Sequence, residues 1–176
     1  LMNSVVEGLN LQVHVLEKDG LLTTERYNES APVIVKVVNE KDYKEAIEPV
    51  ELNIAGDKIT LQSDGFTNPI KTTFNKLINL PYANIMILKN KDYNVRKYPV
   101  DGQLLLAYAP VEKRVTQYQK KTNIALANKD VTVIDIIMRY GNTVKARDII
   151  KKLIEVYNEE AIIDKNSESQ KTKDFI

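Results

Sequence analysis

Few residues of this sequence have the types and spacing that catalysis requires. His14 is the only histidine, and it stands between Val13 and Val15 in an alternating apolar stretch. A catalytic site needs a positioned nucleophile or an acid–base pair, and the sequence supplies neither in a recognisable pattern. We therefore interpret His14 as a structural strand residue rather than as a general base.

Metal, cofactor and phosphate sites are not predicted either. The chain contains no cysteine, which excludes disulfides, thiolate catalysis and thiolate ligation of metals. The spacings HExxH and CxxC cannot occur with one histidine and no cysteine. The six glycines are isolated, so the sequence lacks a phosphate-cradling loop of the form GxxxxGK(S/T). We expect no binding or hydrolysis of ATP, and we predict no catalytic, cofactor-binding or metal-binding residue.

The remaining candidates for acid–base chemistry are pairs of carboxylates. Glu159 and Glu160 are adjacent on a predicted helix, where neighbouring side chains point in different directions. Asp57 and Asp64 adjoin glycines in predicted turns, a position in which aspartate commonly stabilises the chain reversal. Neither pair predicts a catalytic site, so we expect that this chain by itself is not an enzyme.

The charge distribution argues against nucleic acid as a partner. Lysine and arginine total 25 and the acidic residues total 24, which gives a formal net charge of +1. A protein that binds nucleic acid usually carries a clear positive excess. The densest basic stretch contains Lys89, Lys91, Arg96 and Lys97, and Asp92 interrupts it. We interpret this stretch as a solvated loop rather than as an anion site.

Aromatic residues do not form an evident binding platform. The nine tyrosines are spread along the chain, tryptophan is absent and phenylalanine occurs three times. Ligand sites are typically lined by gathered aromatic and apolar side chains. The sequence therefore gives a lectin-like function little direct support.

The composition is typical of one folded domain. The chain has 176 residues, of which 43% are hydrophobic and 28% are charged, and this supplies enough apolar surface for a core. The longest apolar run, residues 104–109, is far shorter than the roughly 20 residues of a membrane-spanning helix. We predict no membrane span within the sequence, and the first residues do not resemble a signal peptide.

Alternating apolar residues and turn signals predict many strands in the first two thirds of the chain. The turn dipeptides Gly56-Asp57 and Asp64-Gly65 separate several of them, so we expect residues 31–97 to form a meander of antiparallel strands. Pro110 then opens a short helix. The predicted strands are residues 11–16, 21–27, 33–38, 50–54, 59–62, 70–74, 84–88, 103–109, 122–127 and 131–138.

Helical periodicity marks both ends of the chain. Apolar residues recur at spacings of three and four over residues 1–9, which predicts a short opening helix. A long closing helix begins near Thr143, and its apolar stripe runs from Ala146 to Ala161. Residues 164–170 are polar. They must project into solvent or pack weakly against another copy of the chain.

The closing segment carries a resemblance to a known family. Residues 133–136 (VIDI) and 142–157 (NTVKARDIIKKLIEVY) resemble a strand and helix of the Wzz-type chain-length determinants, the polysaccharide co-polymerases. Thr143 replaces a proline of the family pattern, and a lysine replaces its asparagine. Residues 158–176, which end TKDFI, are similar to the family's long helix, and residues 1–11 and 25–32 are similar to its opening helix and strand entry.

The resemblance implies a fold, a location and partners. It implies a single periplasmic domain over residues 1–176, flanked in the parent protein by membrane helices outside this sequence. The implied fold is α+β and Wzz-like: an antiparallel or mixed β-sheet base with a strand-rich insertion, a short N-terminal helix and a long C-terminal helix. In this arrangement residues 1–9 pack beside the closing helix near residues 146–153.

The implied function is to regulate the chain length or export of capsular, exopolysaccharide or O-antigen polymers at the bacterial inner membrane. The implied partners are other copies of the membrane-anchored parent, the polysaccharide polymerase, the growing glycan and the export machinery. The match is closest to members whose parent chain carries a cytoplasmic tyrosine autokinase. The alternative from another functional class is a carbohydrate-binding or cell-surface adhesion β-sandwich without catalysis.

Overall fold

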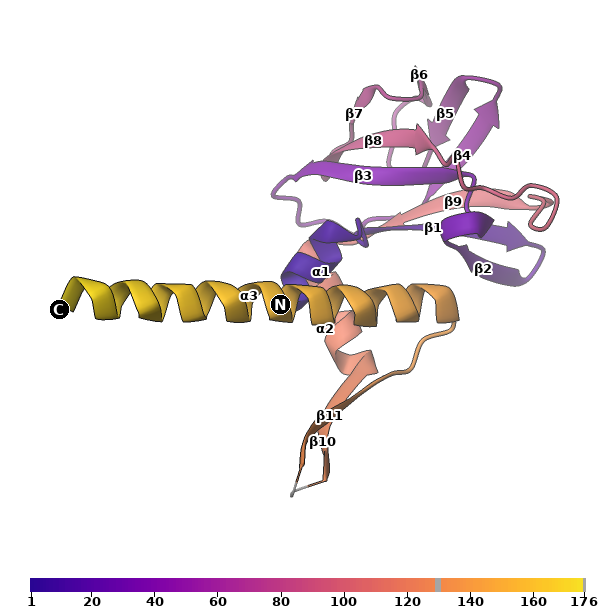
Figure 1. Ribbon diagram of the computed structural model, residues 1–176. Helices are drawn as coiled ribbons and strands as arrows, with labels where there is room; N and C mark the ends of the chain where they lie inside the picture. The colour runs from indigo at the N-terminus through magenta and orange to yellow at the C-terminus, as the bar shows by residue number, and fades with distance from the viewer. Residues whose placement is uncertain (129–130, 176) are drawn as a thin grey trace. The chain divides into compact units, whose positions relative to one another are not determined.

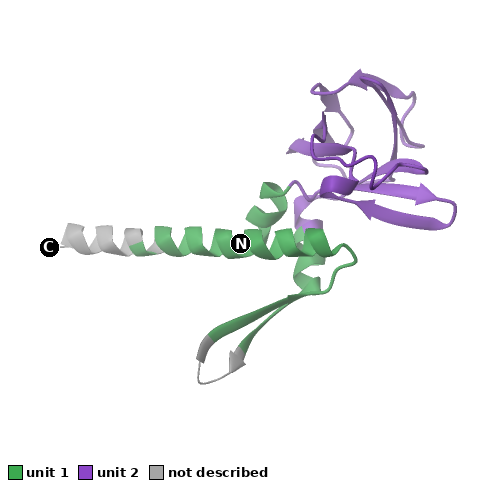
Figure 2. Ribbon diagram, turned by 45° about the vertical axis from the view of Figure 1, so that its right-hand side comes forward, with its two compact units in different colours: residues 1–9, 115–176 green, residues 10–114 purple. Residues whose placement is uncertain are grey.

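The computed structural model describes the backbone of residues 1–128 and 131–175 and, within these ranges, the side chains outside residues 127–132, 164 and 166–176. The chain forms two compact units (Figure 2). Unit 1 comprises Leu1–Leu9 and Val115–Ile176, and unit 2 comprises Asn10–Arg114. In sequence, unit 2 is therefore an insertion between two segments of unit 1. The prediction of a single domain over residues 1–176 stays a prediction.

A six-stranded antiparallel sheet forms one layer of unit 2 (Figure 1), with strand order β2-β1-β9-β4-β5-β6. Gly20 and Gly56 close the β1–β2 and β4–β5 hairpins with φ angles of +56° and +64°, a region that glycine enters at little cost. The strands are β1 (Val13–Asp19), β2 (Leu22–Arg26), β4 (Val50–Ala55), β5 (Lys58–Gln62), β6 (Ile70–Thr73) and β9 (Gln103–Tyr108).

A three-stranded antiparallel sheet forms the second layer of unit 2. Its order is β3-β8-β7, so β3 pairs with a strand far along the chain and not with its sequence neighbour. The strands are β3 (Val33–Glu40), β7 (Leu77–Asn79) and β8 (Ala83–Lys89), and a single 3-10 turn, η1 (Asn28–Ser30), precedes β3.

The core of unit 2 lies between the two sheets. Alternate residues of each strand, such as Val13 and Val15 in β1 and Ile85 and Ile87 in β8, are buried in one continuous apolar cluster. Alternation with period two gives each sheet one apolar face, and the two apolar faces pack against each other. Each fully buried aliphatic side chain contributes about 1.5–3 kcal/mol.

A tyrosine stack and one glutamate connect the core to the helix that follows β9. The rings of Tyr82 and Tyr108 are stacked with their centroids 4.8 Å apart. Burial raises the pKa of Tyr82 to about 12, and burial together with the hydrogen bond to Glu40 raises that of Tyr108. The Glu40 carboxylate also accepts a hydrogen bond of 2.7 Å from the N–H of Val111, the first residue of α2 (Val111–Lys121).

The two ends of unit 2 lie side by side. The N–H of Ala109 donates to the Gln12 carbonyl over 2.9 Å. The buried Arg114 side chain donates through Nη2 to the same carbonyl at 3.2 Å and to the Ala107 carbonyl at 2.7 Å. A guanidinium with several donors suits this role, because it satisfies two strand-end carbonyls at once. Unit 2 is thereby closed where the chain enters and leaves it.

The helices of unit 1 pack together. α1 (Met2–Gly8) buries Val5 and Val6, and α3 (Thr143–Phe175) buries Ile149, Leu153 and Val156. α1 contacts α3, and a Cβ added at Gly8 would lie 3.2 Å from Cε of Lys152. This confirms the prediction that residues 1–9 pack beside the closing helix.

Unit 1 also contains a two-stranded hairpin of β10 (Thr122–Asn128) and β11 (Val131–Met138). The β-rich composition predicted the two strands but not their pairing. Ile124 faces Ile136 and Leu126 faces Ile134 across the antiparallel ladder. Ile124, Leu126 and Ile134 are each more than half exposed. An isolated two-stranded hairpin is marginally stable in water, so it is the least self-sufficient element of unit 1.

The predicted fold class is wrong. We expected an α+β, Wzz-like fold in which one antiparallel or mixed sheet serves as the base for a strand-rich insertion. In the described residues the chain is instead β-rich, with eleven strands in three sheets that contain only antiparallel pairs, and with three α-helices. The resemblance depends mainly on the two ends of the chain, whereas the strands between them pack as their own sandwich because each has one apolar face.

Candidate functional site

A groove of about 850 Å³ opens on unit 2. It is formed by the outer face of β3 and β8, the turn between β4 and β5, the end of β6 and the loop after β8. It is lined by Ile34, Asp57, Thr73, Phe74, Asn75, Leu88, Lys89, Asn90, Lys91 and Asp92. Apolar and hydrogen-bonding side chains thus meet in one concave surface, which is the usual character of a ligand site.

Three apolar side chains line the groove. Ile34 and Leu88 are opposite each other in the β3–β8 register, on the face that points away from the core. Ile34 is 40% exposed although its neighbours Val33 and Val35 are buried, because successive side chains of a strand point to opposite faces. Phe74 follows directly after β6 and is half-buried.

A residue in the left-handed backbone conformation follows Phe74 and fixes the chain direction there. Asn75 has a φ of +62°, a conformation that asparagine tolerates better than most residues. Its N–H donates to the Ile87 carbonyl over 3.0 Å, which ties the end of β6 to β8. This contact between sequence-distant segments holds Phe74 next to β8, where its side chain also packs against the core.

An ion pair lies over the Phe74 ring. The Lys89 ammonium is 2.5 Å from Oδ1 of Asp57 and 5.2 Å from the centroid of the Phe74 ring. The hydrogen bond and the charge of Lys89 hold the pKa of Asp57 below its usual value. Both side chains are more than half exposed, so the pair adds little to the stability of the fold.

Asn90 anchors the start of the loop that borders the groove. Its side-chain amide donates to the carbonyls of Asn28 and Ala31, each at 2.8 Å, and its side-chain oxygen accepts the N–H of Asp92 at 3.0 Å. The side-chain amide of Asn90 is therefore already hydrogen-bonded within unit 2. The exposed side chains of Lys91 and Asp92 remain available at the rim.

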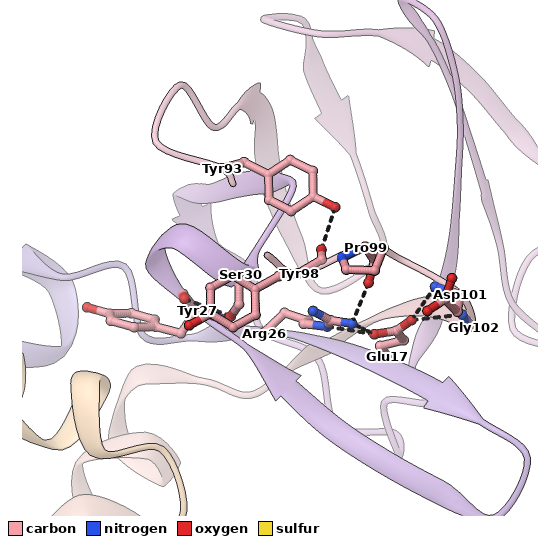
Figure 3. A network of polar contacts seen from close by, with 9 residues as sticks. All are labelled: Glu17, Arg26, Tyr27, Ser30, Tyr93, Tyr98, Pro99, Asp101 and Gly102. Carbon is pink, nitrogen blue, oxygen red and sulfur yellow. Dashed lines mark hydrogen bonds and ion pairs between the residues drawn. The ribbon is translucent and has the colours of Figure 1, made fainter. Parts of the chain in front are cut away.

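A buried carboxylate anchors the other end of this loop, residues 90–102 (Figure 3). Glu17 on β1 accepts the N–H groups of Asp101 at 2.8 Å and Gly102 at 2.7 Å. It also accepts Nε of Arg26 at 2.6 Å and contacts Nη2, which donates in turn to the Pro99 carbonyl at 2.9 Å. Burial raises the pKa of Glu17, but these hydrogen bonds and the Arg26 charge outweigh it, and the net pKa is lowered.

Two further contacts brace the same loop. The Tyr93 hydroxyl donates to the Tyr98 carbonyl over 2.9 Å (Figure 3). A Cβ added at Gly102 would lie 2.4 Å from the carbonyl oxygen of Lys18, so no other residue fits there without a backbone shift. The loop beside the groove is therefore tied to the six-stranded sheet at one end and to the segment just before β3 at the other.

The residues weighed as catalytic candidates lie outside the groove, with one exception. His14 lies on β1, where its Nδ1 is 3.4 Å from Oε1 of Glu25. Glu159 and Glu160 lie on α3, and Asp64 lies in a turn of unit 2. Asp57 also lies in a turn, as predicted, and that turn lines the groove.

The lysines of the basic stretch lie in two different places in the structure. Lys89 and Lys91 line the groove, whereas the Lys97 ammonium lies 5.0 Å from the Tyr98 ring and 3.7 Å from the Glu29 carboxylate. The interpretation of the stretch as a solvated loop stays a prediction, although two of its lysines line the candidate site. Their spacing at i and i+2 at the end of a predicted strand was the available signal, because it can place both on one side of the chain.

A second cluster of charge and aromatic rings lies in unit 1. The Lys145 side chain is only 2% exposed, and its ammonium lies 5.8 Å from the Tyr118 ring and 5.7 Å from the Tyr140 ring. Such contacts stabilise a desolvated cation. Because Lys145 and Tyr118 are both enclosed, we assign this cluster to packing.

Neither a metal-binding cluster nor a helix suited to cross a membrane is found among the described residues. No group of three or more histidine, cysteine or acidic side chains there could hold a metal ion. None of the helices in the described part combines the length and the hydropathy that crossing a membrane requires.

Comparisons with known proteins do not assign the chain to a family. No protein-family model matches the sequence, and the search of curated proteins returned no match.

Proposed function

We propose that unit 2 is a non-catalytic carbohydrate-binding module and that the groove beside Phe74 is its glycan site. The observation that carries the proposal is the combination of an apolar strip, Ile34, Leu88 and Phe74, with polar side chains along its edges. A pyranose presents an apolar C–H face and a rim of hydroxyl groups. A groove with both kinds of surface can contact both at once.

Several groups at the edge can hydrogen-bond sugar hydroxyls. Thr73, Asn75, Lys91 and Asp92 are exposed and line the groove. Together they provide hydroxyl, amide, ammonium and carboxylate groups, which can both donate to and accept from a sugar hydroxyl. Since hydroxyl groups need both kinds of partner, this set suits a carbohydrate better than a purely apolar ligand.

The same residues support binding without hydrolysis. A glycosidase normally needs two carboxyl groups, one of which has a raised pKa and donates a proton to the leaving oxygen. The pKa of Asp57 is lowered by Lys89, which is the opposite of what a proton donor needs. The groove is therefore suited to hold a glycan rather than to cleave it.

Replacing Phe74 by alanine should weaken glycan binding at least about tenfold, the loss expected for a central aromatic contact. Titration calorimetry with fragments of bacterial polysaccharides measures this directly, with a thermal melt to show that the variant is folded. Leu77→Ala is the matched control, because Leu77 is 58% exposed on β7 and lies outside the groove. Equal binding by the Phe74 variant and the wild type would refute the groove as the site.

The second candidate is the regulator of polysaccharide chain length that the resemblance implies. The pairing of α1 with α3 favours it, because the resemblance predicted that these two helices lie together. In this proposal the chain is the periplasmic part of an inner-membrane protein that acts with other copies of itself, the polymerase and the export machinery. The growing glycan is then a ligand in both proposals.

Tyr157→Ser in the membrane-anchored parent should change the length distribution of the cellular polysaccharide without lowering the melting temperature of this chain. Tyr157 is 57% exposed on α3, and exposed sites usually contribute within about 0.5 kcal/mol to stability. Gel profiles of the glycan and melts of the purified chain test the two parts. An unchanged profile would count against the second candidate.

Residues 164–170, where we expected an assembly surface, include side chains that lie outside the described part of the structure.

A further inference from the structure

We infer that the groove selects acidic saccharides and that Lys89 and Lys91 bind the carboxylate of a uronic acid residue while the sugar ring contacts the exposed part of Phe74. This inference rests on the proposed carbohydrate-binding function and specifies its ligand. The geometry behind it is the position of one ammonium group over the aromatic ring and of a second lysine two residues further along the same rim.

Lys91 supplies a positive charge for a ligand. Its side chain is exposed, it lines the groove, and it takes part in none of the ion pairs found among the described residues. The pairs that involve neighbouring lysines use Asp57 for Lys89 and Glu29 for Lys97. Lys91 therefore has the capacity to bind an anion without first giving up a carboxylate.

Lys89 can exchange its carboxylate partner. Asp57 stands in the β4–β5 turn next to Gly56, and its side chain is 80% exposed, so it remains hydrated when the pair breaks. Exposed ion pairs are individually weak. A ligand carboxylate that approaches over the Phe74 ring can replace Asp57 as the partner of the Lys89 ammonium at small cost.

Because Lys89 lies next to Phe74, a sugar that contacts the ring also meets the positive charge of the lysine. The ammonium lies 5.2 Å from the centroid of the Phe74 ring. A sugar ring that contacts the exposed part of Phe74 brings its substituents close to this ammonium. A carboxylate among them gains an ion pair, whereas a neutral hydroxymethyl group gains only an ordinary hydrogen bond. The site thus distinguishes a uronic acid from the corresponding neutral sugar.

Asp92 is a second lining carboxylate, besides Asp57, that opposes this selection. It is exposed at the same rim as Lys91, and its negative charge lowers the attraction for an anion. The inference therefore predicts opposite effects for lysine and aspartate variants. Loss of Lys89 or Lys91 weakens binding of an acidic ligand, and loss of the charge on Asp57 or Asp92 strengthens it.

The experiment compares oligogalacturonate and oligoglucuronate with their carboxyl-reduced forms by calorimetry on the full chain. Lys91→Gln should weaken binding of the acidic forms about two- to fivefold, and Asp57→Asn should strengthen it by a similar factor, as expected for exposed ion pairs. Lys89→Gln combined with Lys91→Gln should weaken it about tenfold. Binding of the reduced forms should change little in all of these variants.

Lys97→Gln is the matched control, since it removes a nearby lysine that lies outside the groove. Weaker acidic binding in the Asp57→Asn variant would overturn the inference, because Asp57 would then contact the ligand directly. Equal affinity for acidic and reduced forms, with both lost in Phe74→Ala, would overturn the acidic selection and leave the carbohydrate site standing. Absence of binding by every form would overturn the proposed function as well.

Discussion

Replacing Glu17 by alanine is expected to lower the free energy of unfolding of unit 2 by about 3 kcal/mol, near the lower end of what removal of one member of a buried ion pair costs. Glu17 is 6% exposed and is the common acceptor for Arg26, Asp101 and Gly102. Without it the guanidinium and two N–H groups lose their partner in a region that water reaches poorly, and unpaired donors there are costly.

Urea denaturation followed by circular dichroism measures this loss, and hydrogen exchange should show faster exchange in residues 90–102. Glu48→Ala is the control, because Glu48 is an exposed glutamate of the same unit that lies outside the network of Figure 3. If both variants were equally stable, the carboxylate would not be the anchor of this loop.

The same anchor makes the stability depend on pH in a defined direction. Because the folded pKa of Glu17 is below its ordinary value of 4.5, the network contributes fully above pH 4.5. Its contribution is lost as the pH falls through the folded pKa, where the folded state also takes up the proton. The stability difference between wild type and Glu17→Ala should therefore shrink as the solution is acidified below pH 4.5.

Leu153→Ala is expected to destabilise unit 1 by about 2–5 kcal/mol, the range for removing a buried leucine side chain. Leu153 is 6% exposed on the face of α3 that packs in unit 1, together with Ile149 and Val156. Truncation leaves a cavity that these rigid neighbours fill only in part. Hydrogen exchange of peptides from α1 and α3, together with the helical circular dichroism signal, reports on unit 1 selectively.

Ile154, the residue that follows Leu153, provides the comparison. Ile154 is 45% exposed, and its replacement by alanine should change stability by no more than about 0.5 kcal/mol. The two substitutions remove similar volumes from consecutive positions of one helix. Similar losses for both would show that the helix buries a different face from the one described.

Local sequence patterns predicted most individual strands of unit 2 but not their partners. The expected strands at residues 33–38, 50–54 and 59–62 correspond to β3, β4 and β5. The three-residue strand β7 was missed, because Leu77–Asn79 is too short for a period of two to be visible. The expected meander was wrong for β3, which pairs with β8. Alternation marks a strand that has one apolar face, and it contains no information about which strand lies next to it.

The candidate site was beyond the reach of sequence patterns for a similar reason. Its residues come from β3, the β4–β5 turn, the end of β6 and the segment after β8, and no spacing links them. Phe74 and Lys89 are fifteen positions apart, and only the return of the chain after β6 onto β8 brings them together. Turn chemistry did place Asp57 in a turn correctly, but a turn residue becomes a site residue only through its distant neighbours.

The closure of unit 2 at Gln12, Ala107 and Arg114 has a consequence for synthesis on the ribosome. All residues of this unit have been made once Arg114 emerges, so it can fold while later segments are still being translated. α1 cannot complete its packing at that stage, because α3 is made after unit 2. The apolar side chains of Val5 and Val6 then remain exposed on the nascent chain. We expect chaperones to bind there.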